Sequence, residues 1–134
     1  MTYGNLERVL QTSLGPITGA LPITSTAPLT GQGILNRPDL GATASKVLSA
    51  GSDGKVRRVS LMCVTVARNI AWTTVAKGAA APTITAVGDG SANEGKLIMG
   101  GGGASADFNV ADNLDLYIVA SAASTAYQLT VVEQ

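Results

Sequence analysis

The chain has 134 residues, of which 46% are apolar, 4% aromatic and 13% charged, and it contains no histidine. Nine Lys and Arg residues balance nine Asp and Glu residues, so the formal net charge is zero. The length fits one domain, and the charged fraction is about half of the usual 25%. Without histidine the chain cannot form a Ser-His-Asp triad, and its only cysteine, Cys63, excludes an intrachain disulfide and a Cys/His zinc site. We therefore expect no enzyme activity, no metal and no cofactor.

Targeting signals are absent from the sequence. Its first residues lack the basic start and apolar run of a signal peptide, and no apolar stretch approaches the ~20 residues that cross a bilayer. We therefore expect a protein made in a cytosol, with no membrane partner. One Trp, one Phe and three Tyr on a chain of zero net charge are atypical of a polyanion binder, so we expect no direct nucleic-acid partner.

Residues 1–42 are predicted to form an extended N-terminal arm. Its first residues have the apolar spacing of a short helix. A triplet of Pro, Ile or Leu, and Thr then recurs every six residues, at 16–18, 22–24 and 28–30. Because proline fixes φ and lacks an N–H donor, this stretch is expected to be extended or edge-strand chain, and neither a helix nor a central strand. It is either a solvated linker or an arm that lies along a partner.

Residues 43–134 are predicted to form an all-β domain. Short apolar or alternating runs are separated by Gly, Asp and Asn at turn spacing. The expected strands lie at 56–67, 70–76, 84–87, 96–99, 106–110, 114–120 and 127–131. The run 56–67 is apolar on both sides over its second half, which predicts a strand covered twice, whereas 114–120 alternates clearly. Seven to eight short strands predict an antiparallel β-sandwich or jelly-roll.

Charge is divided unequally along the chain. Up to residue 68 there are seven basic and three acidic residues, which gives +4, and from residue 69 there are two basic and six acidic residues, which gives −4. Such a division suits electrostatic complementarity with a partner or between copies. An uneven spread of charges over the strands explains it equally simply.

Four segments of the strand half resemble small β-sandwich virion proteins of tailed bacteriophages: GKVRRV at 54–59, NIAW at 69–72, DFNV at 107–110 and DLYIVASAA at 115–123. They are similar in particular to capsid decoration (cement) proteins and related head-surface modules. The resemblance implies a homo-oligomer, a dimer or trimer, at the capsid surface of the virion. There it would sit over junctions between subunits of the major capsid protein and stabilise the assembled head.

Under this hypothesis the arm reaches across neighbouring subunits, and arginines pair with acidic patches of the capsid. The expected partner-binding residues are Leu6, Leu10, Pro16, Ile17, Pro22, Ile23, Pro28, Leu29, Arg37, Arg57 and Arg58. None of them is expected to be catalytic.

Two alternatives belong to other classes. The chain could be a small coat or tail subunit that builds the particle itself. It could instead be a glycan-binding or receptor-binding tip, with Trp72 or a tyrosine as the stacking platform. Trp72 and Tyr117 are, however, more typical of a core or an interface.

Overall fold

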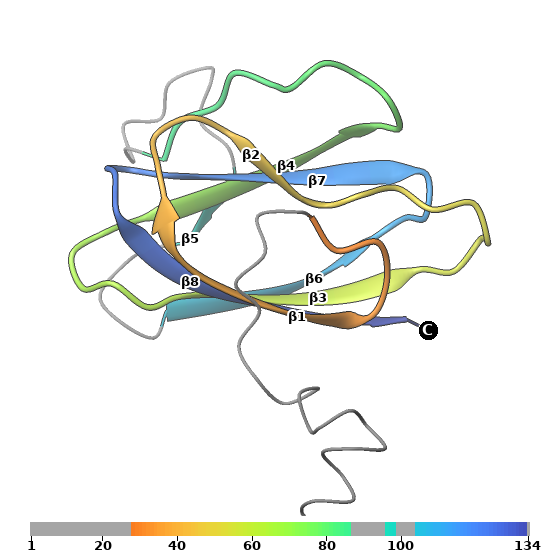
Figure 1. Ribbon diagram of the computed structural model, residues 1–134, viewed down its shortest axis with the longest axis horizontal. Helices are drawn as coiled ribbons and strands as arrows, with labels where there is room; N and C mark the ends of the chain where they lie inside the picture. Colours follow the sequence, from red (N-terminus) through yellow and green to blue (C-terminus); the bar gives the residue numbers. More distant parts are fainter. Residues whose placement is uncertain (1–27, 87–95, 99–103, 134) are drawn as a thin grey trace, which may run out of the picture.

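The computed structural model describes residues 28–86, 96–98 and 104–133, and at 96–98 and 104 the backbone alone. In these residues it contains eight strands (Figure 1): β1 (Gly33–Leu40), β2 (Ser45–Leu48), β3 (Arg57–Cys63), β4 (Ile70–Ala76), β5 (Lys96–Ile98), β6 (Ala104–Val110), β7 (Leu114–Ala120) and β8 (Thr125–Glu133). The strands form two sheets, sheet I in the order β1-β8-β3-β6 and sheet II in the order β2-β7-β4-β5. Every pairing is antiparallel. The expected all-β fold is therefore confirmed.

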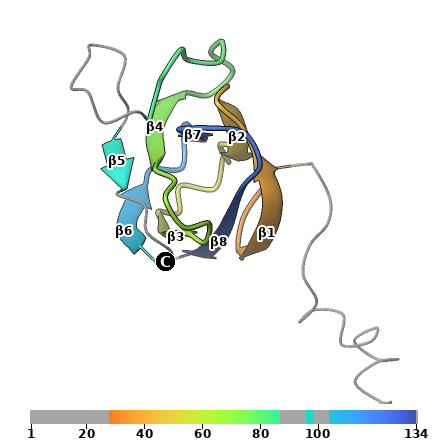
Figure 2. The same cartoon turned by 90° about the vertical axis from the view of Figure 1, so that its left-hand side faces the viewer.

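The two sheets lie face to face, in a sandwich-like arrangement (Figure 2). Their inward side chains form one apolar core, to which sheet I contributes Leu35, Val59, Leu61, Leu129 and Val131, and sheet II contributes Val47, Leu48, Ile70, Leu116 and Ile118. None of these side chains is more than 2% exposed. Full burial of one such side chain stabilises a fold by about 1.5–3 kcal/mol, so this shared core holds the sheets together.

The outer face of sheet II is covered by the chain that follows β4. Ile84 and Ala86, which the sequence predicted to lie in a strand, pack instead on Ala71 of β4 and Val119 of β7. As a result β7 is buried on both faces, whereas alternation of the kind seen at 114–120 is typical of a half-buried strand. The segment contains too few large apolar residues for its sequence to predict that it covers a sheet.

The opposite outcome is found at β3. Its inward residues Val59, Leu61 and Cys63 are fully buried, as the alternation predicted. The prediction that its second half is covered twice is wrong, because β3 ends at Cys63, and Val64 and Val66 beyond it are 46% and 69% exposed. Apolar side chains at that end of the sandwich therefore face outward in the described part of the chain.

The sandwich also begins earlier than the predicted boundary at residue 43. Strand β1 lies inside the segment expected to be an arm, and it pairs with β8 from Gly33 onward. The register shifts between Arg37 and Leu40, where Pro38 has no N–H to donate, and β1 is accordingly an edge strand. Residues 33–40 thus belong to the β domain, and the part of the expected arm before residue 28 lies outside the described residues.

Candidate interaction site

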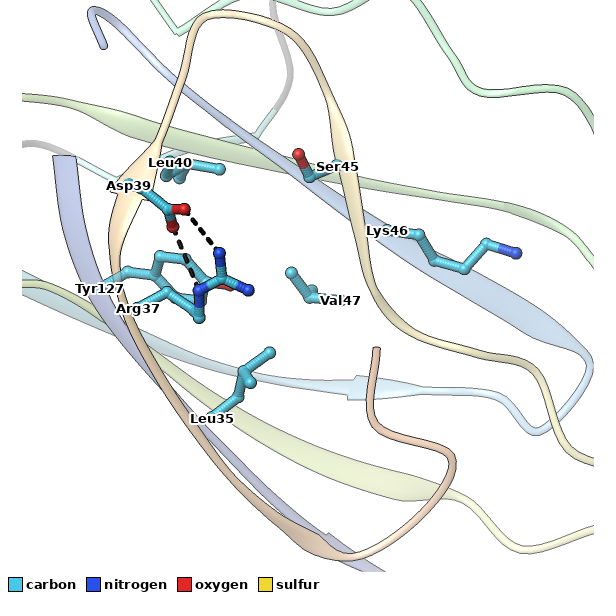
Figure 3. Close-up of a pocket in the computed structure, with 8 residues that line it drawn as sticks. All are labelled: Leu35, Arg37, Asp39, Leu40, Ser45, Lys46, Val47 and Tyr127. Atoms are coloured by element: carbon cyan, nitrogen blue, oxygen red, sulfur yellow. Dashed lines mark hydrogen bonds and ion pairs between the residues drawn. The ribbon is translucent and has the colours of Figure 1, made fainter. Parts of the chain in front are cut away.

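A hollow opens between the edge strands β1 and β2, where sheet I and sheet II part (Figure 3). Its volume is about 170 Å³. The lining residues are Leu35, Arg37, Asp39 and Leu40 of β1, Ser45, Lys46 and Val47 of β2, and Tyr127 of β8. We call this space the β1–β2 hollow.

The floor of the β1–β2 hollow is apolar and tightly packed. Leu35, Leu40 and Val47 are 2–3% exposed and Tyr127 is 6% exposed, so all four belong to the core as well as to the lining. Burial raises the pKa of Tyr127 to about 12, although the nearby Arg37 charge opposes the shift. The phenol therefore stays protonated at neutral pH, and the floor carries no charge.

The rim of the hollow carries paired charges. The Arg37 guanidinium donates from Nε to Asp39 Oδ1 at 3.1 Å and from Nη2 to Oδ2 at 2.6 Å, a bidentate fork. The Lys46 side chain extends away from Arg37 (Figure 3), and its Nζ lies 3.5 Å from Asp115 Oδ2. The rim is thus polar but locally neutral.

Asp115 is a buried carboxylate that ties β7 to two loops. Its Oδ1 accepts a hydrogen bond from the Ala50 N–H at 2.7 Å, and its Oδ2 accepts one from the Gly78 N–H at 3.3 Å. Burial alone would raise the pKa of Asp115, but these two N–H donors and the Lys46 charge together lower it. The carboxylate consequently remains ionised and fixes Lys46 beside the hollow.

Leu29 pairs with the end of β2, next to residues that line the β1–β2 hollow. It forms an isolated parallel bridge with Leu48. Its N–H donates to the Val47 carbonyl at 2.9 Å, and its own carbonyl accepts from the Ser49 N–H at 2.8 Å. The Leu29 side chain packs half-buried against the core. Of the predicted partner-binding residues, Leu29 is therefore committed to the chain's own fold.

The three arginines expected to bind a partner have three different environments. Arg57 is 1% exposed and donates to the carbonyls of Ser49, Ala111, Asp112 and Leu114 at 3.0–3.4 Å. The guanidinium of Arg57 is therefore enclosed by these backbone segments and is bound within the chain's own fold. Arg37 is bound by Asp39 with a side chain only 13% exposed. Arg58 has a side chain 50% exposed and lies 3.8 Å from Asp107 on β6.

The other predicted partner-binding residues are placed as follows. Pro28 directly precedes the Leu29 bridge and is half-buried. Leu6, Leu10, Pro16, Ile17, Pro22 and Ile23 lie outside the described residues. Of the predicted partner-binding residues that the structure describes, Arg37 lines the β1–β2 hollow. Leu29 and Arg57 both bind the backbone of Ser49, through its N–H and its carbonyl respectively.

A second, more open hollow of about 310 Å³ lies beside β1, β8 and the residue that follows β3, and is lined by Asn36, Arg37, Pro38, Val64, Ala126 and Tyr127. The exposed Val64 contributes to its wall. The apolar run that contains Val64 predicted a covered side chain, whereas the Val64 side chain is exposed at this hollow.

The chemistry of the described residues is limited in kind. They contain no group of three or more His, Cys, Asp or Glu side chains placed to hold a metal ion. No helix in this part of the chain is long and apolar enough to cross a membrane. Cys63 is buried, and burial raises the pKa of its thiol. Comparisons with protein-family models, with curated proteins and with solved structures find no match.

Proposed function

We propose that this chain is a non-enzymatic structural protein of a virus particle, a decoration protein that binds the assembled head of a tailed bacteriophage and stabilises it. The observation that carries the proposal is the strand order. Orders β1-β8-β3-β6 and β2-β7-β4-β5 are nested, as when one long hairpin is rolled into two sheets. This is the order of an eight-stranded jelly-roll, a fold of viral capsid domains and also of lectins and cupins. The fold supports a viral structural protein by analogy alone. The role of a decoration protein has to be argued from the surface of the molecule.

The outer face of sheet I suits burial in an assembly. The side chains that alternate with its buried residues are mostly uncharged: Ile34, Asn36, Ser60, Met62, Gln128, Thr130 and Val132. Ile34 and Val132 are 43% and 47% exposed. The charges on this face include Arg58 and Asp107, which are paired with each other. Depletion of charged residues is characteristic of the centre of protein interfaces.

Such a surface supports decoration by simple thermodynamics. A protein that binds the assembled shell and not its free subunits stabilises the shell by linkage. Copies bound at many equivalent sites gain avidity from one another, so each single contact can be weak. In this proposal the partner is the major capsid protein, the chain acts as a homo-oligomer, and the N-terminal arm adds contacts to those of sheet I.

The experiment is co-sedimentation of the purified full-length chain with heads of the phage whose genome encodes it. We expect saturable binding and a higher temperature of head disruption. Val132→Lys on the outer face of sheet I should lower the affinity at least about tenfold, because it leaves an unpaired charge in the interface. Thr83→Lys, at an exposed position in the segment that covers sheet II, is the matched control.

Three outcomes would contradict the proposal. The chain could fail to bind heads, it could bind with equal affinity when residue 132 is lysine, or it could assemble unaided into shells or tubes. The last result would favour the coat or tail subunit. In the full chain, Ile17→Asp tests the arm separately, and unchanged occupancy of the heads would remove the arm from the proposal.

A further inference from the structure

We propose that the end of the sandwich that carries Val66 is an interface between two copies of this chain, related by a two-fold axis near the start of β8. Val66 of each copy enters the hollow beside Pro38 of the other, and Arg68 of each copy pairs with Asp39 of the other. The inference rests on the proposed function only in that the chain there acts as a homo-oligomer. It concerns a surface other than the outer face of sheet I, and binding to a phage head plays no part in it.

Three loops lie together at this end of the sandwich: residues 41–44 between β1 and β2, 64–69 between β3 and β4, and 121–124 between β7 and β8. Backbone hydrogen bonds join them. The Ser121 N–H donates to the Asn69 carbonyl at 3.0 Å, and the Gly41 carbonyl accepts from the first residue before the β7–β8 loop at 2.9 Å. The loop after β3 projects beyond the neighbouring strands, at the left of Figure 1. We call the surface formed by these three loops the Val66 end.

The Val66 end is poor in charge and carries exposed apolar side chains. Its three loops contain one charged residue, Arg68. The described loops at the opposite end contain four: Asp53, Lys55, Lys77 and Asp112. Val64 and Val66 are 46% and 69% exposed. Few charges together with exposed apolar side chains are characteristic of the centre of an interface.

The hollow of about 310 Å³ beside Val64 gives Val66 a place to bind on a second copy. Pro38, Val64 and Ala126 are among its lining residues. It exceeds the roughly 150 Å³ of an apolar cavity that takes up benzene, so a valine side chain fits. Val66 lies two residues from Val64, and the projecting side chain and the hollow therefore belong to one patch. A patch that holds both parts of a contact is self-complementary, as a two-fold dimer requires.

Charge favours the same pairing. In the described part of the chain the half-buried Arg68 makes no ion pair, and its Nε is buried without a hydrogen-bond partner. Such a group gains from an acidic partner, because burial of an unpaired charge is costly. Asp39 directly follows Pro38 of the hollow, and its side chain is 60% exposed. Its two oxygens accept from Arg37 and keep further lone pairs for a second donor.

One two-fold axis makes both contacts at once. In sheet I, β8 lies between β1 and β3. Val66 and Arg68 follow β3, whereas Pro38 and Asp39 lie near the end of β1, on the other side of β8. Neighbouring strands are about 4.8 Å apart, so β1 and β3 are separated by about 10 Å. An axis at the start of β8 exchanges the two sides, and it therefore forms the apolar and the charged contact together.

The first test is sedimentation equilibrium of the purified full-length chain without heads. We expect a dimer. Val66→Lys should raise its dissociation constant at least about tenfold, because an unpaired charge replaces each of the two apolar contacts. The high exposure of Val66 leaves folding unaffected. The matched control is Val56→Lys, at a valine that is 39% exposed just before β3 at the opposite end, and it should leave the dimer unchanged.

The second test uses two charge-reversed variants with different tags. Arg68→Glu and Asp39→Lys should each dimerise at least about tenfold more weakly than wild type, because each homodimer contains two like-charged contacts. Their equimolar mixture should form heterodimers at close to the wild-type affinity, since both contacts then join opposite charges. Asp39→Lys also removes the contact with Arg37 inside the chain. The comparison of Val66→Lys with Val56→Lys therefore stands by itself if that variant does not fold.

Each other result overturns the inference. A wild-type chain that is monomeric at the highest soluble concentration, or trimeric, has no such two-fold interface. Equal losses for Val66→Lys and Val56→Lys would place the contact elsewhere. A dimer that dissociates with Val132→Lys and not with Val66→Lys would assign it to the outer face of sheet I. Heterodimers no tighter than the two homodimers would exclude the Arg68–Asp39 pairing. Head binding is measured separately, so these outcomes leave the proposed function to its own experiment.

Discussion

The indole ring of Trp72 lies flat on the phenyl ring of Phe108, with ring centroids 3.7 Å apart and planes inclined by 8°. Trp72 belongs to β4 of sheet II and Phe108 to β6 of sheet I, so the stack joins the two sheets. Both rings also pack against the core. Because Phe108 covers one face of the indole and both rings pack against the core, the stack gives Trp72 a structural role between the sheets.

Replacing Trp72 should therefore weaken the sandwich. We expect Trp72→Ala to lower the free energy of unfolding by about 3 kcal/mol, from lost burial and lost ring stacking. Trp72→Phe keeps a ring against Phe108 and should lose less than half as much. Urea unfolding followed by far-UV circular dichroism measures both. A loss below about 1 kcal/mol for Trp72→Ala would contradict the stack's role between the sheets.

The neighbouring Arg57 and Arg58 provide a second, internally controlled prediction. Arg57→Met should lower the free energy of unfolding by about 3 kcal/mol or more, because four carbonyls lose charged donors inside the fold. Arg58→Met removes only the exposed pair with Asp107, and should cost less than about 1 kcal/mol. Thermal and urea unfolding of the two variants in the same buffer give the comparison. Equal losses would mean that the carbonyls around Arg57 find other donors.

A third prediction concerns backbone strain in the β3–β4 loop. Ala67 has φ of 63°, in the left-handed region that favours glycine. Ala67→Gly should raise the free energy of unfolding by about 0.5–1 kcal/mol, since relief of strain exceeds the added entropy of the unfolded chain. The control, Ala76→Gly at the end of β4, has no such strain and should be destabilising. A loss of stability in Ala67→Gly would show that the left-handed conformation is relieved in solution.

Sequence patterns predicted the fold where a strand's burial follows from its own alternation. The expected strands 70–76 and 114–120 coincide with β4 and β7, and Val59, Leu61 and Cys63 are buried as expected. The patterns failed where burial depends on a distant segment. Ile84 and Ala86 cover β7, and Val64 is exposed. Both outcomes depend on how loops fold over the sheets, and local periodicity carries no information about that.

The candidate site was harder to predict than the strands for the same reason. Arg57 and Arg58 are adjacent in the sequence, yet the strand alternation places the first inside the fold and the second outside. Strand β1 was missed because Asn36, Arg37, Pro38 and Asp39 interrupt its apolar pattern. The β1–β2 hollow brings Tyr127 against residues 35–47, and a contact over that sequence distance leaves no local signal.

The last prediction follows from the lowered pKa of Asp115. A carboxyl whose pKa is lower in the folded than in the unfolded chain stabilises the fold above the unfolded value, here 3.8, and this stabilisation is lost as the pH falls through the folded value. At pH 7, Asp115→Asn should lower the free energy of unfolding by about 1–3 kcal/mol, because the Ala50 and Gly78 N–H groups lose a charged acceptor.

The difference between wild type and Asp115→Asn should then narrow as the pH falls below 3.8, where the wild-type carboxyl becomes protonated. Urea unfolding between pH 7 and the acid limit of folding measures it. Asp107→Asn, at an exposed position, is the matched control and should cost less than about 1 kcal/mol at neutral pH. A gap between wild type and Asp115→Asn that stays constant into acid would mean that the Ala50 and Gly78 donors do not depend on the charge of residue 115, and that Lys46 is held beside the hollow by other contacts.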